Sequence, residues 1–485
     1  MRHAILLICC NPLEEISQLV DCFDEDFDIF IHYDKKIKII ASELELFLTA
    51  HPRIRFFSDY KLRWGGMPIV KVELTMLRRI VDTAQYGYIH IISGNDRPIK
   101  SMSQIKAFFN RYSGNEFVGC FPLPDYRWEH GTYARFDIYR LNDWFDYRKP
   151  FGRRLIDFVN NLQIRLNVHR SVPRQVARLY GGSTWMSITG NCARYIVDNL
   201  HIYRPLLRRL KCTFAPDEVF LPSLIMNSPF GEHVVGNDAR FIRWRPGEPS
   251  PMWLTMNDCF DIATSDRTVF ARKFHPKYSA RLFKWIKNNI LEAKSPVIGE
   301  HGEWYSASLG GHEFDSKLAA AIAELLRTLD VHTAADFGCG PGWYVAMMRR
   351  MGIAAQGYDA NPHTPDISKV FFLNGFHCQQ LDLSEEARAD NPFEFVMSLE
   401  VGEHIPPQFQ DTFLDNVAYN SSRYVLLSWA VPGQPGDGHV NMLSNETVIK
   451  EMKARGFRYS DAVSISLRKR AGLEWFKDTL MFFER

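Results

Sequence analysis

The feature that most constrains this chain is a glycine-rich turn, Asp336-Phe-Gly-Cys-Gly-Pro-Gly, which joins a strand-like run to a helical one. The small and apolar residues Thr333 to Phe337 form the strand-like run, and an amphipathic stretch begins at Trp343. Three glycines at alternate positions let the backbone turn tightly, so a ligand can lie against bare backbone at the helix N-terminus. The turn therefore predicts an α/β fold with a ligand site at the carboxyl end of a strand.

The spacing of the glycines distinguishes between two classes of ligand. A dinucleotide-binding turn, Gly-x-Gly-x-x-Gly, would need a glycine at position 343, but the chain has Trp343 there. Two acids follow at the ends of later strand-like runs, Asp359 in Gly-Tyr-Asp-Ala-Asn-Pro and Asp382 in Gln-Leu-Asp-Leu-Ser. A carboxylate at such a strand end can accept hydrogen bonds from ribose hydroxyls. The pattern disfavours a nicotinamide dinucleotide.

In order and spacing, these residues resemble the class I S-adenosylmethionine-dependent methyltransferases, over about Gly302 to Arg485. The resemblance implies a Rossmann-like domain with S-adenosyl-L-methionine as cofactor. It implies that Asp336 and the turn glycines hold the methionine end of the cofactor. Asp359 would then bind the ribose and Asp382 the adenine. The turn glycines are Gly338, Gly340 and Gly342.

A second polar motif, Glu400-Val-Gly-Glu403-His404-Ile-Pro, follows the strand-like run Phe393 to Leu399. In-line methyl transfer depends mainly on alignment, and a base is needed only where the acceptor must lose a proton. His404 is the nearest candidate for that base, with packing or capping of the next helix as the alternative. Glu400 and Glu403 could lie either at the cofactor edge or in solvent.

The same alternation of strands and helices also occupies the first half of the chain. A length of 485 residues suggests two to four domains. Short β-rich runs alternate with amphipathic stretches from the start, and the pattern restarts near Phe314, which implies a second domain. Lys294 to Gly302 is linker-like, so we place the boundary at Ser295, giving domains 1–294 and 295–485. The early strand-like runs are Ala4–Cys10, Phe27–His32, Ile54–Phe57 and Tyr88–Ile92.

Composition excludes several classes of protein. A net charge of +2 provides no overall attraction to nucleic acid or to an anionic membrane. The nine cysteines are scattered and form no CxxC pair, so neither a disulfide framework nor a zinc site is indicated, and a reducing compartment fits best. The apolar start Ala4 to Cys10 is too short for a transmembrane segment. Nothing indicates the oligomeric state.

Polar motifs follow three of the early strands and predict a crevice at one edge of the sheet. Asp34 lies in Tyr-Asp-Lys-Lys, and Asp96 lies in Ser-Gly-Asn-Asp-Arg-Pro. Between them, Arg-Trp64-Gly-Gly places an aromatic ring, on which a sugar or base could stack, beside flexible backbone.

Three further motifs come later in this half: Gly-Ser-Thr-Trp185 in a predicted β segment from Gly182 to Thr189, Asp-Glu218-Val-Phe at a helix start, and Phe-Ala-Arg272-Lys273-Phe. Taken alone, the two acids could be helix-capping charges and the two bases a solvated pair.

Together, the six motifs resemble the core-2/I-branching glycosyltransferase family, which includes the peptide xylosyltransferases, over about Met1 to Ile290. The resemblance implies an inverting GT-A type transferase that uses a UDP-sugar and lacks the Asp-x-Asp metal site, so no metal is expected. It implies that Glu218 is the general base and that Lys273, with Arg272 beside it, neutralises the leaving diphosphate. The candidate donor contacts are Asp34, Trp64 and Asp96.

The leading hypothesis is a bifunctional enzyme that transfers N-acetylglucosamine or xylose to a glycan or lipid-linked saccharide and methylates the same or a related glycan. One alternative makes only one half catalytic and the other a binding or assembly module. Another directs methylation to an unrelated small molecule. Animal members of the family carry a membrane anchor and disulfides, whereas this chain begins at its first strand, so we expect a bacterial cytoplasmic enzyme.

Overall fold

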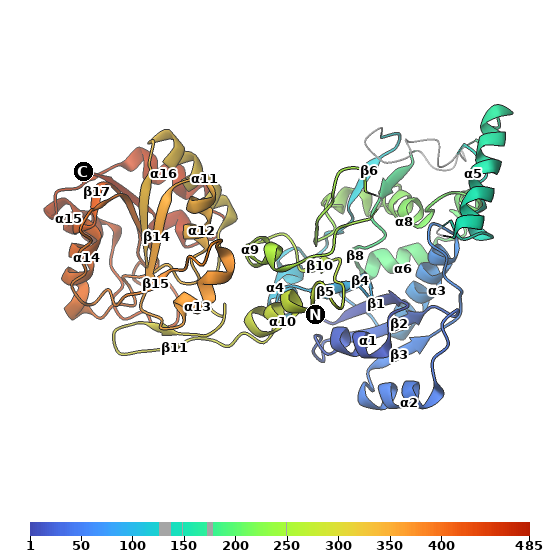
Figure 1. Cartoon of the computed structure of the whole chain (residues 1–485), viewed down its shortest axis with the longest axis horizontal. Helices are drawn as coiled ribbons and strands as arrows, with labels where there is room; N and C mark the ends of the chain where they lie inside the picture. Colours follow the sequence, from blue (N-terminus) through green and yellow to red (C-terminus); the bar gives the residue numbers. More distant parts are fainter. Residues whose placement is uncertain (126–136, 148, 172–177, 249) are drawn as a thin grey trace. The chain divides into compact units, whose positions relative to one another are not determined.

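A computed structural model describes residues 1–125, 137–147, 149–171, 178–248 and 250–485 (Figure 1). The chain divides into two compact units, Met1–Leu254 with Arg267–Ala280, and Thr255–Asp266 with Arg281–Arg485. The segment Thr255–Asp266 belongs to the second unit because it packs there: the Phe260 ring lies 6.1 Å from that of Phe371. The start of the methyltransferase domain at Ser295 stays a prediction.

The first unit is built on a five-stranded sheet of order β3-β2-β1-β4-β8, in which β8 alone is antiparallel to its neighbour. Along β1, Ala4, Leu6 and Ile8 join one hydrophobic core, while the intervening apolar residues join the other. Side chains alternate across a strand, so a continuously apolar strand is buried on both faces. The strands are β1 (His3–Cys9), β2 (Phe27–Tyr33), β3 (Ile54–Phe57), β4 (Tyr88–Ser93) and β8 (Ser187–Thr189).

The predicted continuous β segment from Gly182 to Thr189 was wrong. Its ends belong to two sheets, because Ser183 forms a tight turn in which its hydroxyl accepts a hydrogen bond from Trp185 N at 3.1 Å. The residues between the two strands, Ser183–Met186, are called the strap below. The smaller sheets pair β5 (Asp96–Pro98) with β10 (Phe270–Arg272) and β9 (Arg240–Ile242), and β6 (Cys120–Pro122) with β7 (Tyr180–Gly182).

Amphipathic helices connect and cover these strands. In α3 the buried residues recur at helical spacing, for example Val72, Met76 and Ile80, and Pro68 supplies the fixed φ suited to the first turn. The main helices of this unit are α1 (Leu13–Val20), α2 (Ala41–Ala50), α3 (Pro68–Thr83), α4 (Met102–Arg111), α5 (Pro150–Arg165), α6 (Gly190–Asp198), α7 (Arg204–Arg209) and α8 (Asp217–Met226).

The second unit contains a seven-stranded sheet of order β15-β14-β13-β16-β17-β19-β18. Strand β19 runs antiparallel to its neighbours β17 and β18, and the other pairs are parallel. The order reverses between β13 and β16, and ligands of open α/β sheets bind at such a switch point, beyond the carboxyl ends of the strands. The strands are β13 (Thr333–Phe337), β14 (Ala354–Asp359), β15 (Gln379–Gln380), β16 (Phe393–Leu399), β17 (Ser421–Ser428), β18 (Arg458–Tyr459) and β19 (Met481–Glu484).

Helices cover both faces of this sheet (Figure 1). Buried residues of α11, α12 and α16 form one core, and those of α14 and α15 form the other. No helix in the described parts of the chain is long and apolar enough to cross a membrane. The helices are α9 (Cys259–Ala263), α10 (Ala280–Ile286), α11 (Ser316–Thr328), α12 (Trp343–Arg350), α13 (Thr364–Ser368), α14 (Gln410–Tyr419), α15 (Asn445–Ala454), α16 (Asp461–Arg470) and α17 (Phe476–Thr479).

Candidate active sites

The predicted glycine turn follows β13 at the switch point of the second unit. Gly338, Gly340 and Gly342 have φ values of +79°, +52° and +82°, which only glycine adopts readily. A Cβ on Gly338 would lie 2.3 Å from the Val401 side chain, so the turn also packs closely against the segment after β16. The turn therefore requires glycine for both its conformation and its packing.

The first two predicted acids of the cofactor site lie beside this turn. Asp359 ends β14, and its carboxylate accepts hydrogen bonds from Gly340 N at 2.7 Å and Asn361 N at 2.9 Å. Burial raises its pKa, and burial followed by the charge of Asp359 raises the pKa of Asp336 well above the usual range. Asp359 is thus fixed by backbone hydrogen bonds, and Asp336 is buried close to it.

Asp382, the third predicted acid, is paired with a histidine that the sequence did not single out. His301 Nδ1 lies 2.8 Å from Asp382 Oδ2, and Ser384 N donates to Asp382 Oδ1 at 2.9 Å. Burial acts to raise the pKa of Asp382, but the hydrogen bonds from His301 and Ser384 outweigh it, and the net pKa is lowered. The hydrogen bond to Asp382 raises the pKa of His301.

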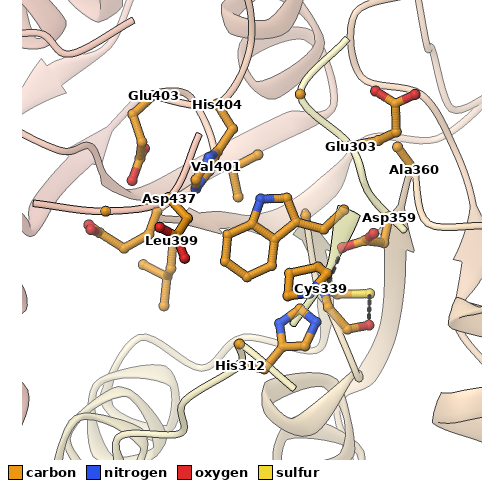
Figure 2. Close-up of a pocket in the computed structure, with 18 of the residues that line it drawn as sticks. Glu303, His312, Cys339, Asp359, Ala360, Leu399, Val401, Glu403, His404 and Asp437 are labelled. Carbon is orange, nitrogen blue, oxygen red and sulfur yellow. Dashed lines mark hydrogen bonds between the residues drawn. The ribbon is translucent and has the colours of Figure 1, made fainter. Parts of the chain in front are cut away.

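The three acids, His301, Gly338 and Gly340 line one cavity of about 420 Å³, whereas Gly342 is not among its lining residues. Figure 2 shows Cys339 and Asp359 in one part of its wall, and Glu403 and His404 in another. The expected linker also contributes to the wall through Ser295, Pro296, His301 and Gly302. Just after it, β12 (Trp304–Tyr305), which pairs with β11 (Val297–Ile298), places the Trp304 ring 5.1 Å from that of His404. The residues from Lys294 to Gly302 are therefore part of the site as well as a connection.

The cavity fits the cofactor that the fold implies. Two of its buried polar groups, Trp304 Nε1 and Trp343 Nε1, have no hydrogen-bond partner among the described residues. Buried polar atoms are rarely left unpaired unless a ligand or water completes them. Together with bare glycine backbone and three acids, they suit a polar, nucleoside-containing cofactor.

The predicted base, His404, lies on the cavity wall. Its Nδ1 is 3.2 Å from the carbonyl oxygen of Gly438, and burial lowers its pKa to about 4. The adjacent Glu403 is fully buried, which excludes solvent, one of the two positions considered for it. Burial and then the charge of Glu400 raise the pKa of Glu403 well above the usual range. Glu400 also lines the cavity and accepts a hydrogen bond from Gln434 Nε2 at 2.7 Å.

In the first unit, the strap connects two of the predicted motifs. Thr184 Oγ1 donates to Asp217 Oδ2 at 2.7 Å, next to Glu218 at the start of α8. The adjacent Trp185 ring lies 4.6 Å below the guanidinium of Arg272. Two consecutive residues, Thr184 and Trp185, therefore contact the acidic start of α8 and the basic motif, respectively.

Asp96, Arg272 and Lys273 form a second group that adjoins the strap through Arg272. Residues Asp96 and Arg272 face each other across the β5–β10 pair, with Oδ1 and Nε 3.5 Å apart, and both are buried. Asp96 also accepts hydrogen bonds from the Ser93 backbone and hydroxyl. Lys273 Nζ lies 2.6 Å from Ser250 Oγ, and its pKa is lowered, first by burial and then by Arg272.

Trp64 and Glu218 are brought toward each other by their neighbours. Gly65 O accepts a hydrogen bond from Ala215 N at 3.0 Å, and the Trp64 ring packs edge-on against Phe214 at 5.2 Å. Ala215 O in turn accepts a hydrogen bond from Glu218 N at 3.2 Å. Glu218 is half-buried, whereas Asp217 is only 7% exposed.

Asp34 is placed differently from the other donor-site candidates. It is buried, and its Oδ1 accepts hydrogen bonds from Lys36 N and Leu62 N, both at 3.0 Å. It thereby fastens the end of β2 to the loop before Trp64. Its contact with a donor sugar stays a prediction.

The sequence interpretation missed several residues. Glu73 is fully buried on α3, and neither of its carboxylate oxygens has a hydrogen-bond partner among the described residues. The sequence does mark Glu73, because this charged residue interrupts an apolar stripe that includes Val72, Met76 and Ile80. His301, His312 and His439 line the cavity of the second unit, but no local pattern marks them.

Two family models match this chain. The model described as Core-2/I-Branching enzyme covers residues 6–262, and the model described as Methyltransferase domain covers residues 311–461. Among curated proteins, a xylosyltransferase of Ciona intestinalis is 20% identical over 82% of this chain and 46% of its own length. Xylosyltransferase 1 of Rattus norvegicus is 22% identical over 56% of this chain and 32% of its own. The chain thus spans less than half the length of these relatives.

Two solved methyltransferases align with about a third of the chain. The magnesium protoporphyrin IX methyltransferase of Synechocystis PCC 6803 with bound SAH is 16% identical, with a TM-score of 0.28, and covers 34% of this chain and 81% of that one. An amino pentose methyltransferase from Micromonospora echinaspora is 14% identical, also with a TM-score of 0.28, and covers 34% and 89%.

Proposed function

Because the chain belongs to the Core-2/I-Branching enzyme family and also carries an S-adenosylmethionine-dependent methyltransferase domain, we propose that it transfers a sugar from a UDP donor to a glycan and methylates the same or a related glycan. The observation that carries the sugar-transfer half is the strap, which contacts both the acidic start of α8 and Arg272. Xylose is the first donor to test, since the curated relatives named above are xylosyltransferases.

Glu218 is the general base of the proposed sugar transfer. It would remove the proton of the acceptor hydroxyl as that oxygen attacks the anomeric carbon, a role that needs one well-placed carboxylate. The contrast with its neighbour supports this assignment: Asp217 is buried and accepts from Thr184, while Glu218 is more exposed. Asp217 then has a positioning role.

The leaving UDP carries negative charge that fixed cations can stabilise. Arg272 and Lys273 supply two such charges on a single strand end. Because Arg272 contacts both Asp96 and Trp185, its guanidinium is already positioned before the reaction. Lys273 is only half-buried, which leaves it suited to a direct phosphate contact.

For the methyl-transfer half, the residues around the glycine turn would hold the cofactor. Asp336 and Gly338, Gly340 and Gly342 would hold its methionine end, Asp359 its ribose and Asp382 its adenine. S-adenosyl-L-methionine, when bound, supplies an electrophilic methyl group. The protein contributes alignment of the acceptor and exclusion of water.

Product mass spectrometry with the full chain tests the coupling of the two activities. The chain is incubated with a panel of UDP-sugars, S-adenosyl-L-methionine and a set of glycan acceptors, and UDP release identifies the donor. The proposal expects one product that gains both a sugar and a methyl group, or two related glycans that gain one each. Methylation only of a non-glycan, or release of no UDP with any donor, would refute it.

A further inference from the structure

Three residues on the wall of the second unit's cavity form a group that the proposed function does not use. Glu403, His404 and His439 each offer one ligand atom, and these atoms all lie within 4.8 Å of one another. Glu403 and His404 follow β16, whereas His439 lies in the loop after β17. Two segments that are distant in sequence therefore converge on one point of the cavity.

The carboxylate of Glu403 is fully buried next to a second acid, Glu400. Neither of its oxygens has a donor at good hydrogen-bond geometry among the residues that the structure describes, although the Ala430 backbone lies close to it. A buried, unpaired carboxylate is costly unless a charge or a metal compensates it. A cation bound between Glu403 and the two histidines would provide that compensation.

Both histidines are oriented as metal ligands are. Nδ1 of His404 lies 3.2 Å from the carbonyl oxygen of Gly438, and Nδ1 of His439 lies 3.2 Å from that of Gln434. A carbonyl oxygen can only accept a hydrogen bond, so Nδ1 carries the proton and a neutral ring keeps a lone pair on Nε2. Metal-binding histidines commonly show this arrangement, with one ring nitrogen on a backbone carbonyl.

Backbone contacts fix the two segments to each other. The carbonyl oxygen of Glu403 accepts hydrogen bonds from Val440 N and Asn441 N, both at 2.9 Å. Gly436 lies against the His439 ring, where an added Cβ would be 2.2 Å from the ring atoms. The backbone on either side of His439 is therefore tied to Glu403, and its ring packs against the same loop.

From this geometry we propose that Glu403, His404 and His439 bind one divalent transition-metal cation. Two imidazoles and one carboxylate, with further positions open, are a ligand set used by catalytic Zn²⁺ and by Fe²⁺. All three residues line the cavity, so the open positions face the space beside the glycine turn. There the ion can receive an oxygen of the methyl acceptor and lower the pKa of a hydroxyl. This last role rests on the proposed function; the ion site does not.

This site would change the role expected for His404. As a ligand, it uses the Nε2 lone pair that a general base would need, so one side chain cannot serve in both roles at once. The sequence analysis expected no metal in the chain, and the proposed site departs from that expectation. The cation proposed here belongs to the methyltransferase domain.

Equilibrium dialysis of the tag-free full chain against Zn²⁺ and Mn²⁺, without cofactor or glycan, tests the site. The wild type should bind one equivalent of at least one ion, and Co²⁺ should give an absorption band typical of nitrogen and oxygen ligands. His439→Gln and Glu403→Gln should each weaken binding at least tenfold and abolish that band. Binding of S-adenosylhomocysteine reports whether each variant is folded.

His377→Gln is the matched control. Its Nδ1 also lies near a backbone carbonyl, that of Gly375 at 3.3 Å, but His377 is exposed and does not line the cavity. It should leave ion binding unchanged. A wild type that binds no ion specifically, or a folded His439→Gln variant that binds as tightly as the wild type, would overturn the proposal. Ion binding by a chain that methylates no glycan would support the site and count against the proposed function alone.

Discussion

The two units hold their polar residues in different ways. In the first unit the candidate residues are fastened by side-chain pairs from distant segments, such as Asp217 with Thr184 and Asp96 with Arg272. In the second unit much of the site is backbone, a glycine turn that follows one strand, and several cavity groups remain without partners among the described residues.

This difference indicates how each site is prepared for its ligand. In the first unit, each side chain of a pair compensates its partner for the loss of contacts with water. The polar groups are therefore preorganised before a ligand binds. In the second unit, the unpaired Trp304 and Trp343 indole N–H groups retain hydrogen-bonding capacity that a ligand can satisfy. We expect substitutions in the first unit to act by removing a charged group from the site. Substitutions in the glycine turn should act by displacing the backbone that shapes the cavity.

Glu218→Gln should give the largest effect. Loss of the general base is expected to lower the rate of sugar transfer by about 10²- to 10⁴-fold, and methyl transfer should stay within about twofold of the wild type. UDP release and methyl incorporation by the same preparation measure the two activities. Glu232→Gln, which removes an exposed carboxylate, is the control. Equal loss of both activities would mean that the two sites do not act independently.

Glu116→Gln tests the paired, buried polar groups of the first unit. Glu116 accepts hydrogen bonds from Thr189 N and Oγ1, and burial raises its pKa from 4.5 to about 7. The folded state therefore binds this proton more tightly than the unfolded state. The resulting stabilisation is complete below pH 4.5 and is lost as the pH rises through 7.

Between pH 5 and 8, the free energy of unfolding of the wild type should fall by about 2.5 kcal/mol more than that of Glu116→Gln. Calorimetry of the full chain at several pH values measures this difference. Glu248→Gln, at an exposed position of the same unit, should follow the wild type. Parallel pH profiles for wild type and Glu116→Gln would show that Glu116 does not titrate in this range.

Lys273→Met should weaken binding of UDP about 10- to 100-fold, because a hydrogen bond to a charged group contributes about 1.5 to 3 kcal/mol. Lys273 is a better test than Arg272, whose removal would leave the buried Asp96 without its ion-pair partner. Isothermal titration with UDP measures the effect, and Lys277→Met, at an exposed position, is the control. Unchanged affinity would remove Lys273 from the donor site.

Gly340→Ala should give the smallest of these effects, about tenfold weaker binding of S-adenosylhomocysteine. The new Cβ would lie 2.9 Å from the His312 ring at a positive φ, so the turn must shift. Gly352→Ala is the matched control, since its φ is also positive but no atom lies within 4 Å of the added Cβ. Equal affinities for the two variants would mean that the turn does not shape the cofactor site.

The fold of both units was largely predictable, because buried strands are marked by local apolar runs. The early strand-like runs all appear as β1 to β4, and Phe393–Leu399 is β16. The segment from Gly182 to Thr189 was mistaken for one strand because its β-rich composition does not reveal the turn at Ser183. The linker-like residues after Lys294 gave no sign that they would line a cavity.

By itself, the sequence determined the glycine turn with its neighbouring acids and the order of the motifs in the first unit, because these depend on residues close together in the chain. Only the tertiary structure decided which motifs meet. It placed Thr184 against Asp217 and the adjacent Trp185 against Arg272, paired His301 with Asp382, and brought His439 to Glu403. Such contacts join segments separated by tens of residues, and their geometry depends on strand order and loop conformation, which local patterns do not encode.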